Sequence, residues 1–382
     1  MHHERSCAQG DVLGLMRVML APDSYKGCLT SKEVCAAITE GILKVSDSID
    51  VVQFPSSDGG EGFCDCMRNI YGGDLIKREV TFPLGNRGFA EFVFNKETQT
   101  AFIELASASG LPLVPKEERN ILVANTYGTG ELICEAVKLG ATNIIIGLGG
   151  SATNDCGIGM LSAMGMRFLD EDGYDLIPRP TSLDFVKSVD KSQMIDLAGV
   201  KFTAACDVKN PLCGKNGAAE VFSRQKGASE EEVALLDAWT FSFASALGID
   251  PDIAGSGAAG GVGAAVLSVL GGTYVSGASL LVNSDGFKKA LSCSDLLITG
   301  EGNSDYQTAF GKLVSVVVKS ANESGVKSIV LSGGLSNGYE ALYDIGADEC
   351  YSLVSENHSV DYCIEHAYEL LIEKTKEIIS RF

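Results

Sequence analysis

The chain has 382 residues, of which 45% are hydrophobic, and its formal net charge is -20. A chain of this length exceeds the size at which a single core stops growing, so we expect two domains. The acidic balance disfavours binding to nucleic acid or to an anionic membrane surface, because both reward clustered lysine and arginine. The longest apolar run, 258–272, is too short for a membrane span, which needs about 20 residues, and predicts a buried helix.

Cysteine and histidine usage narrows the possible chemistry. The twelve cysteines are scattered without a C-x-x-C pair, which favours reduced thiols and a cytoplasmic protein. The four histidines lie near the two ends of the chain, which argues against imidazole catalysis and against a His-ligated zinc site. We therefore expect any general base to be a carboxylate.

The first predicted elements are a strand, a loop and a helix. An apolar run at 17–21 ends in the loop 22–27, and Thr30 with Glu33 forms a capping box at the start of a periodic helix. This order of elements is typical of open α/β sheets, which bind ligands beyond the carboxyl ends of their strands.

The same arrangement occurs twice more along the chain. The run 51–54 leads into the loop 57–62, and the run 295–299 leads into the loop 300–305, with a further strand at 328–331. Each loop contains glycine and carboxylates directly after a predicted strand. We expect the three loops to contribute to one ligand site.

The middle of the chain differs from its ends. Segments 80–94 and 101–105 predict antiparallel strands around a turn at Asn95, and further on come a glycine-rich loop, a strand at 201–205 and the apolar helix. We infer that the middle is a second α/β domain inserted into the first.

The expected domain boundaries follow from this contrast. Residues 1–15 form an N-terminal extension, 16–75 and 289–382 form a discontinuous, Rossmann-like domain with a parallel sheet, and 76–288 form the inserted domain. The helical spacing of the last segment predicts that it packs on the first domain.

The most informative segment is 147–157, which we call the cradle. It follows the apolar run 144–146 and consists of glycines, small hydroxyl residues and the pair Asn154 and Asp155. Glycines let backbone N–H groups approach an anion, and the following helix start adds a positive dipole end. The sequence therefore predicts a phosphate site.

Two kinds of phosphate ligand are possible. Residues 147–152 match the dinucleotide pattern G-x-G-x-x-A, with Asp170 ending a second apolar run, as in an NAD-dependent oxidoreductase. A carboxylate at Asp155 would repel a pyrophosphate unless a metal ion lay between them, which favours a magnesium nucleotide.

Several loops, in this order, resemble the glycerate kinase type 1 family over nearly the whole chain from about residue 16. The matching segments are 21–27, 57–62, 108–111, 118–120, 126–131, 147–155, 206–212, 225–228, 299–308 and 311–312. The resemblance implies an ATP- and Mg²⁺-dependent kinase that phosphorylates D-glycerate, with 2-phosphoglycerate as the product. It also implies two α/β domains with the active site in the cleft between them. The family's acidic loop usually reads Gly-Glu-Gly-Arg-Ile-Asp, whereas this chain has Asn303 in place of the arginine.

Phosphoryl transfer needs alignment, metal ions, cationic groups and a carboxylate that accepts the hydroxyl proton. No Walker A sequence occurs, so the nucleotide must be held in another way. We assign this role to the cradle and to a neighbouring helix start: Thr129, Gly130, Gly149, Gly150, Ser151 and Asn154.

Two acids are candidates for Mg²⁺, Asp155 and Asp207, because this ion takes one or two carboxylates and keeps several waters. Asp155 could equally be a helix N-cap, and Asp207 could be a turn acid before Asn210. The alternatives remain open at the level of sequence.

Catalytic candidates lie in the acidic loops. Asp23 and Asp58 compete for the role of general base, and each could instead be a solvated loop acid. Together with Lys26 and Asp207, Glu301 and Asp305 complete the catalytic set, and the last two could bind metal or orient the substrate.

The anionic substrate needs positive partners. We expect Arg119 to bind the glycerate carboxylate, because arginine can hold a carboxylate with two hydrogen bonds, whereas Lys226 and Lys312 would act as point charges. Asn210 completes the substrate-binding set. For each cation the alternative is a surface salt bridge.

The expected partners are small molecules, and a homo-oligomer is compatible with the sequence. Besides the oxidoreductase, a catalytically weak glycerate- or nucleotide-binding homologue is a further reading, motivated by Asn303.

Overall fold

The computed structural model describes residues 16–25, 27–56, 59–310 and 312–382. The chain is a mixed α/β protein with parallel sheets and forms two compact units. Unit 1 consists of Met1–Ser57 and Gly277–Phe382, and unit 2 consists of Asp58–Ser276.

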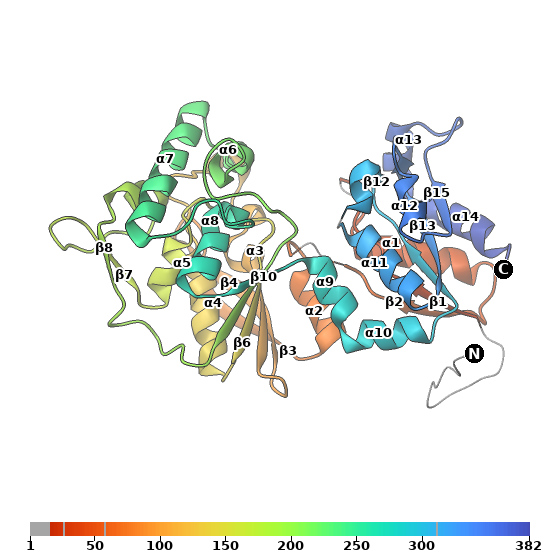
Figure 1. The fold of residues 1–382 in the computed structure, drawn as a ribbon, viewed down its shortest axis with the longest axis horizontal. Helices are drawn as coiled ribbons and strands as arrows, with labels where there is room; N and C mark the ends of the chain where they lie inside the picture. Colours follow the sequence, from red (N-terminus) through yellow and green to blue (C-terminus); the bar gives the residue numbers. More distant parts are fainter. Residues whose placement is uncertain (1–15, 26, 57–58, 311) are drawn as a thin grey trace. The chain divides into compact units, whose positions relative to one another are not determined.

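Unit 1 is built on a five-stranded, wholly parallel sheet that combines both ends of the chain, coloured red and blue in Figure 1. The strand order is β15-β13-β11-β1-β2. The strands are β1 (Arg17–Leu20), β2 (Asp50–Gln53), β11 (Leu296–Thr299), β13 (Lys327–Ser332) and β15 (Glu349–Ser352). A two-stranded parallel pair, β12 (Asn303–Ser304) and β14 (Gly334–Leu335), lies outside this sheet.

Helices cover both faces of the unit 1 sheet, as its buried central strands β1, β11 and β13 require. On one face, α1 (Ser31–Leu43) and α14 (Ala367–Ile379) bury Val34, Ile38 and Leu371 against β1 and β11. On the other, α11 (Leu313–Glu323) and α12 (Ala341–Asp344) pack on β13. The remaining helices are α9 (Gly277–Asn283), α10 (Asp285–Ser292) and α13 (Val360–Glu365).

The strand order of unit 1 reverses between β1 and β11. From β1 the chain passes through α1 to β2 on one side, whereas β11, β13 and β15 follow one another on the other side. In open α/β sheets, ligands bind beyond the carboxyl ends of the strands at such a reversal. The loops after β1 and β11 are therefore placed to form a site.

Unit 2 contains a six-stranded mixed sheet in the order β10-β9-β6-β5-β4-β3. The strands β3 to β5 run antiparallel, as expected from the sequence, and β5, β6, β9 and β10 are parallel. The bounds are β3 (Asp74–Thr81), β4 (Arg87–Asn95), β5 (Thr100–Glu104), β6 (Asn143–Gly147), β9 (Lys201–Ala205) and β10 (Thr273–Val275). A separate antiparallel pair consists of β7 (Arg167–Leu169) and β8 (Ser188–Asp190).

The two faces of the unit 2 sheet are covered differently. One face packs against α4 (Tyr127–Lys138), α5 (Ile158–Ala163) and α8 (Ala258–Ala264) in a single large core. On the other face, α2 (Phe63–Tyr71) packs on β4 and β5, where Tyr71 stacks on Phe102 with ring centroids 5.1 Å apart. The other helices of the unit are α3 (Leu105–Ser109), α6 (Ala218–Phe222), α7 (Glu230–Leu247) and a π-helical turn, Ala265–Val269.

Three local predictions are confirmed. Thr30 and Glu33 form the capping box of α1, and α14 packs on α1. The apolar run 258–272 begins with the buried helix α8. Its first turn departs from the helical conformation, since Ala259 has φ 52° and the two glycines that follow also have positive φ.

The unit boundaries differ from the expected ones. Divisions were expected after residues 75 and 288, but the compact units divide after 57 and 276. The reason is packing: α2 contacts β4 and β5 of unit 2, and α9 contacts α11 of unit 1. The expected extension, 1–15, lies outside the described residues.

Two general properties complete the description. Within the described residues ten cysteines are free thiols, whereas Cys293 is disulfide-bonded, which departs from the expectation of reduced thiols. Across the described part of the chain, every helix is too short or too polar to cross a lipid bilayer.

Candidate active site

The loops after β1 and β11 of unit 1 are joined by backbone hydrogen bonds. Asp23 N donates to Gly300 O at 2.8 Å, and the Thr299 hydroxyl donates to Ala21 O at 2.7 Å. These bonds extend the contact of the two strands beyond their carboxyl ends. The acids of both loops are thus held at the reversal of strand order.

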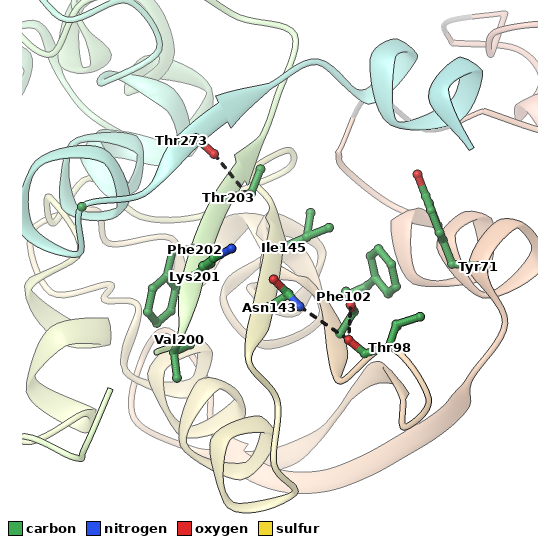
Figure 2. A pocket seen from close by; sticks show the side chains of 12 residues that line it. Tyr71, Thr98, Phe102, Asn143, Ile145, Val200, Lys201, Phe202, Thr203 and Thr273 are labelled. Carbon is green, nitrogen blue, oxygen red and sulfur yellow. Dashed lines mark hydrogen bonds between the residues drawn. The ribbon is translucent and has the colours of Figure 1, made fainter. Parts of the chain in front are cut away.

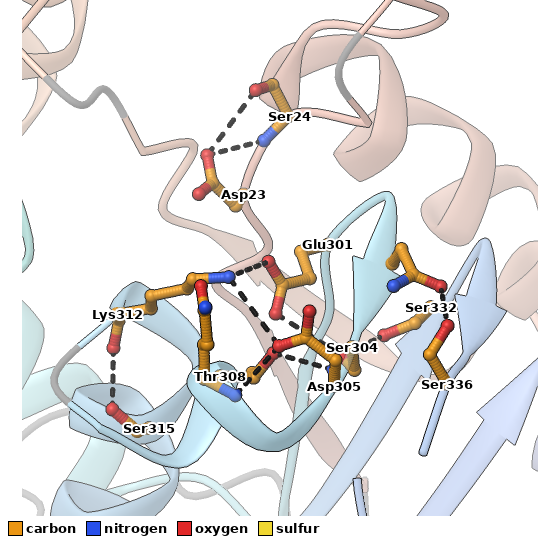
Figure 3. A network of polar contacts seen from close by, with 12 residues as sticks. Asp23, Ser24, Glu301, Ser304, Asp305, Thr308, Lys312, Ser315, Ser332 and Ser336 are labelled. Atoms are coloured by element: carbon orange, nitrogen blue, oxygen red, sulfur yellow. Dashed lines mark hydrogen bonds and ion pairs between the residues drawn. The ribbon is translucent and has the colours of Figure 1, made fainter. Parts of the chain in front are cut away.

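Four predicted residues form what we call the acid–lysine network: Asp23, Glu301, Asp305 and Lys312. Figure 3 shows the Lys312 side chain extending toward the two acids of the β11 loop, with Nζ 3.9 Å from Glu301 Oε2 and 3.9 Å from Asp305 Oδ1. Both distances exceed those of a direct charged hydrogen bond. The lysine, 43% exposed, is therefore near its partners without being fixed by them.

Glu301 is the buried acid of this network, with only 13% of its side chain exposed. Burial raises its pKa; nearby Asp23 acts in the same direction, and Lys312 opposes the shift. Ser304 donates to Glu301 Oε1 at 3.3 Å and shares a hydrogen bond with Ser332 at 2.8 Å. Seryl side chains thus fix the orientation of the Glu301 carboxylate.

Asp305 has a local role in addition to its place in the network. It is the N-cap of the 3₁₀ turn Tyr306–Ala309, and its Oδ1 accepts a hydrogen bond from Gln307 N at 2.8 Å. Asp23 is similarly constrained, because Ser24 N donates to its Oδ1 at 2.7 Å. Each carboxylate is oriented by a backbone N–H that follows it in the chain.

Asn303, the residue that departs from the family pattern, lies in β12. Its Oδ1 accepts a hydrogen bond from the Ser336 hydroxyl at 2.9 Å. The chain therefore replaces an arginine by an amide that joins two loops of unit 1.

In unit 2 the predicted cradle lies at the carboxyl edge of the main sheet. The register pairs Glu104, Gly147 and Ala205, so β5, β6 and β9 end side by side. Gly149 N donates to Gly59 O at 2.8 Å, which brings the loop after residue 58 to the same edge. The sequence had assigned that loop to the other domain.

Two glycines of the cradle permit this close approach. A Cβ on Gly149 would lie 2.4 Å from the Gly60 Cα, and one on Gly147 would lie 2.6 Å from Gly59 O. Such distances exclude any side chain unless the backbone moves. Gly147 and Gly149 are therefore required by the packing of the cradle against the loop at Gly59 and Gly60.

Glu104 is a site residue that the sequence reasoning missed. It accepts a hydrogen bond from Cys64 N at 3.2 Å at the start of α2, and burial raises its pKa. The N-cap residue of α2 is Gly62, and the carboxylate that accepts from the first turn of the helix comes from β5. A glutamate directly after an apolar strand was the signal that could have identified it.

Lys226 lies beneath the cradle. Its side chain is buried, and Nζ donates to Ser151 Oγ and to Thr153 O, both at 2.7 Å. Burial lowers its pKa to about 7, and Asp155 acts in the opposite direction. Lys226, which the sequence assigned to substrate binding, is an internal cation of the cradle, so its alternative as a surface salt bridge is wrong.

Asp155 is fully buried, and hydrogen bonds from four donors occupy its carboxylate. It accepts from Thr126 N and Oγ1 at 2.9 and 2.8 Å and from Gly157 N and Gly159 N, both at 3.1 Å. Burial raises its pKa, and these hydrogen bonds oppose the shift. The N-cap residue of α5 is Gly157, so Asp155 is not itself the N-cap; its carboxylate joins the starts of α4 and α5. Both carboxylate oxygens are used and buried, which disfavours a metal ligand.

The other expected cradle residues have packing roles. Thr129 and Gly130 lie inside the first turn of α4, where Thr129 shares a hydrogen bond with Ser109 at 2.8 Å. A Cβ on Gly130 would lie 2.2 Å from Met160 O, so this glycine allows α4 to pack closely on α5. Asn154 is fully buried and accepts a hydrogen bond from Ser223 at 3.3 Å.

Asp207 retains the position expected of a site acid. It is exposed and lies two residues beyond β9, at the sheet edge that carries the cradle. Asn210 instead holds its own loop, since its Nδ2 donates to Asn216 O at 2.8 Å.

Arg119 packs against the turn that carries Lys226. Its guanidinium donates to Gln225 O at 3.1 Å, and within the described residues its buried Nε has no hydrogen-bond partner. An unsatisfied buried donor of this kind suits a ligand or an ordered water. Lys26 and Asp58, also expected in the site, lie outside the described residues.

A pocket of about 490 Å³ lies elsewhere in unit 2, on the face of β5, β6 and β9 shown in Figure 2. It includes Thr100, Asn143 and Lys201 at the amino ends of these strands, opposite the cradle. It contains no residue that the sequence assigned to the site.

The dinucleotide reading fails on connectivity. The strand before Asp170, β7, pairs with β8 and is absent from the main sheet that contains β6. Asp170 accepts from Asp172 N and Tyr174 N at 3.0 and 2.9 Å and so closes its own turn. The acid that would bind a ribose is therefore not placed beside the cradle.

Comparison with known proteins agrees with this architecture. A crystal structure from Salmonella typhimurium LT2 that is named after glycerate kinase 2 superposes with a TM-score of 0.79 at 36% identity. The alignment covers 96% of this chain and 98% of that one. The fold is thus that of a two-unit α/β protein of the glycerate kinase type.

The sequence comparisons identify the family. The Glycerate kinase family profile matches residues 18–382. The "Glycerate kinase" of Bacillus cereus is 42% identical over 96% of this chain and 97% of its own length, and the "Glycerate 2-kinase" of Escherichia coli is 38% identical over 96% and 97%. The chain belongs to the glycerate kinase family and is an enzyme, a kinase that acts on small molecules. Membership implies ATP as a substrate.

Proposed function

We propose that this enzyme, as a type 1 glycerate kinase, transfers the γ-phosphate of ATP to D-glycerate, with 2-phosphoglycerate and ADP as products and Mg²⁺ as the required ion. The acid–lysine network at the strand-order reversal of unit 1 carries this proposal, because it combines carboxylates with a mobile cation. The name of the Escherichia coli relative, a glycerate 2-kinase at 38% identity, supports the 2-phosphate product.

The residues present fit a magnesium ion of the kind that takes one or two carboxylates and several waters. Among the described residues no group of three or more His, Cys, Asp or Glu side chains is arranged as a metal site, so water must supply the remaining ligands. We assign the ion to Asp207, an exposed acid just beyond β9. Within unit 1, Glu301 and Asp305 could bind metal or orient the substrate. When bound, the ion neutralises phosphate charge.

The chain's own groups have the following proposed roles. Asp23 or Asp58 accepts the proton of the glycerate hydroxyl. Lys312 leaves its 3.9 Å contacts and binds the transferring phosphoryl group, and Lys26 adds positive charge. Arg119 binds the glycerate carboxylate.

We assign the nucleotide phosphates to the cradle. Two backbone donors, Gly150 N and Ser151 N, have no hydrogen-bond partner within the described part of the chain. They follow Gly149, whose own N–H donates to Gly59 O. Lys226 lies behind the two donors, where it donates to Ser151 Oγ. Free donors backed by a cation suit an anion. Asn154, Thr129 and Gly130 shape this loop.

Ten free thiols support a reducing, cytoplasmic location, which we propose together with small-molecule substrates as the partners.

One coupled assay tests the proposal. Purified enzyme is incubated with ATP, D-glycerate and Mg²⁺; ADP is followed continuously, and the phosphorylated product is identified by NMR. We expect ADP release that requires all three components, with phosphate on the 2-hydroxyl. Glycerate binding without turnover would instead identify a weak homologue, as Asn303 suggests, and phosphate on the 3-hydroxyl would contradict the assigned product.

A further inference from the structure

The proposed reaction uses the charge of Lys226 but leaves the contact of its ammonium with Ser151 unexplained. Its side chain is 3% exposed, and Nζ lies 2.7 Å from both Ser151 Oγ and Thr153 O. A lysine is rarely this buried, since taking an ammonium group out of water is costly. The cost of burying this charge must therefore be offset by an interaction that Lys226 makes in the cradle.

The turn that carries Lys226 is held from several sides. Lys226 N donates to Ser223 O at 3.0 Å, and Gly227, with φ +100°, donates to Arg224 O at 3.1 Å. From the other side Arg119 donates to Gln225 O at 3.1 Å. The ammonium is thus presented to the cradle by a fixed turn rather than by a flexible surface side chain.

Hydrogen-bond chemistry determines what this contact does to Ser151. An ammonium group only donates, so Ser151 Oγ must be the acceptor of the 2.7 Å bond. Its own hydrogen is then directed away from Lys226. Within the described residues no other hydrogen bond engages Ser151 Oγ, which leaves its O–H free to donate to a ligand.

The charged groups around Lys226 also favour an anionic ligand at the cradle. Asp155 is the charged group that acts on Lys226 electrostatically, and Arg119 packs against the same turn. The Asp155 carboxylate already accepts hydrogen bonds from Thr126, Gly157 and Gly159. Burial lowers the pKa of Lys226 to about 7 although Asp155 acts in the opposite direction. A further negative charge bound nearby would therefore stabilise the protonated lysine.

We propose that Lys226 is a positioning residue for nucleotide phosphates: it turns the Ser151 hydroxyl into a donor aimed into the cradle and supplies positive charge from behind it. The inference rests on the proposed function, which places the phosphates at the cradle. It differs from direct binding, because Lys226 acts through Ser151 and through the charge of the loop.

The test compares three variants by calorimetric binding of ADP and of inorganic tripolyphosphate, and by steady-state kinetics. Lys226→Met keeps the length of the side chain but removes its charge, Ser151→Ala removes the donor, and the double variant measures their coupling. We expect affinity to fall about tenfold to hundredfold in Lys226→Met, and the double variant to lose little more. The KM for ATP should rise while the KM for glycerate is unchanged.

Controls separate positioning from folding. Lys191→Met removes an exposed lysine of the same unit and should bind both anions as the unmodified enzyme does. Ser151→Thr retains a hydroxyl and should restore most of the affinity that Ser151→Ala loses. Full affinity of Ser151→Ala for ADP and tripolyphosphate would overturn the proposal, as would independent, additive losses in the double variant.

A further measurement uses only the unmodified enzyme and is unaffected if Lys226→Met does not fold. Tripolyphosphate binding is measured between pH 6.5 and 9 in buffers of different ionisation heats. An anion beside Lys226 stabilises its protonated form, so binding should take up a proton and weaken above about pH 7. Absence of proton uptake would contradict the charge role. If glycerate is not phosphorylated at all, the proposed function fails while these binding results still decide the role of Lys226.

Discussion

The cradle of unit 2 and the acid–lysine network of unit 1 represent two ways of preparing a site for phosphate chemistry. The cradle is buried and fixed: Asp155 accepts four hydrogen bonds, and Lys226 makes two at 2.7 Å. In the network, Lys312 is 43% exposed and lies 3.9 Å from each of its partners. One region is assembled before a ligand arrives, and the other can rearrange around it.

This difference predicts which substitutions should lower stability and which should lower turnover. Groups in a preorganised loop support each other, so removing one affects folding as well as binding. Groups in an exposed network contribute little to stability, because solvent screens them, and their removal should act on turnover. The following substitutions apply this contrast within unit 2, where buried groups of the cradle are compared with the exposed acid Asp207.

The largest effect is expected for Asp155→Ala in unit 2. The change leaves the Thr126, Gly157 and Gly159 donors without their acceptor and removes the negative charge near Lys226. We expect the free energy of unfolding to fall by about 3–5 kcal/mol. Denaturant unfolding measures it, with Asp172→Ala, which removes an exposed acid of the same unit, as the control. A loss confined to activity, with unchanged stability, would show that Asp155 is a metal ligand after all.

Asp207→Asn should behave in the opposite way. Asp207 is exposed at the carboxyl edge of β9, so the amide should leave stability unchanged, while turnover falls about a hundredfold to a thousandfold. Steady-state kinetics at saturating ATP and glycerate, together with a melting curve, provide the measurement. Asp196→Asn serves as the matched control, and near-normal turnover would remove Asp207 from the site.

Gly149→Ala probes the contact between two loops. The added methyl would lie 2.4 Å from the Gly60 Cα and must displace backbone. We expect a loss of stability of about 1–3 kcal/mol and weaker ADP binding, measured by unfolding and calorimetry. Gly140→Ala tests positive-φ strain without a close neighbour, since Gly140 has φ +93° and nothing within 4 Å. Gly149 itself does not have a positive φ, so unchanged stability of Gly149→Ala would mean that the contact with Gly60 does not constrain the loop.

The smallest effect concerns the pH dependence of stability. The pKa of Lys226 is about 7 in the folded protein and near 10.4 when unfolded, so between these values the unfolded chain binds more protons. Stability attributable to this group therefore rises with pH, by about 1 kcal/mol between pH 7 and 8. Comparing the enzyme with Lys226→Met by denaturant unfolding isolates the term. A difference between the two proteins that does not change with pH would contradict it.

Much of the fold was predictable because capping, hydrophobic periodicity and turn signals in the sequence agree with the burial of each segment in the folded protein. The capping box of α1, the antiparallel strands around Asn95 and the packing of the last helix were confirmed. The carboxyl-end loops were also identified correctly as sites of acids and glycines. Motif order, more than any single glycine pattern, identified the family.

The roles of particular residues were less predictable. Gly130 resembles a phosphate-loop glycine in the sequence, but it serves helix packing, and Lys226 resembles a surface cation but is buried. Glu104 gave little signal because a glutamate at the end of a strand is common. Local patterns do not report which distant segment covers a residue.

The sequence by itself determined the strands, the helix starts and the glycine-rich, acidic loops at strand ends, because periodicity, capping and backbone freedom are properties of neighbouring residues. Only the tertiary structure decided that the loop at Gly59 joins unit 2, that Asp155 is sealed and that Lys226 reaches Ser151. These facts depend on desolvation and on contacts between segments far apart in the chain. Burial is what turns an ordinary lysine or aspartate into part of a site, and burial is set by the whole fold.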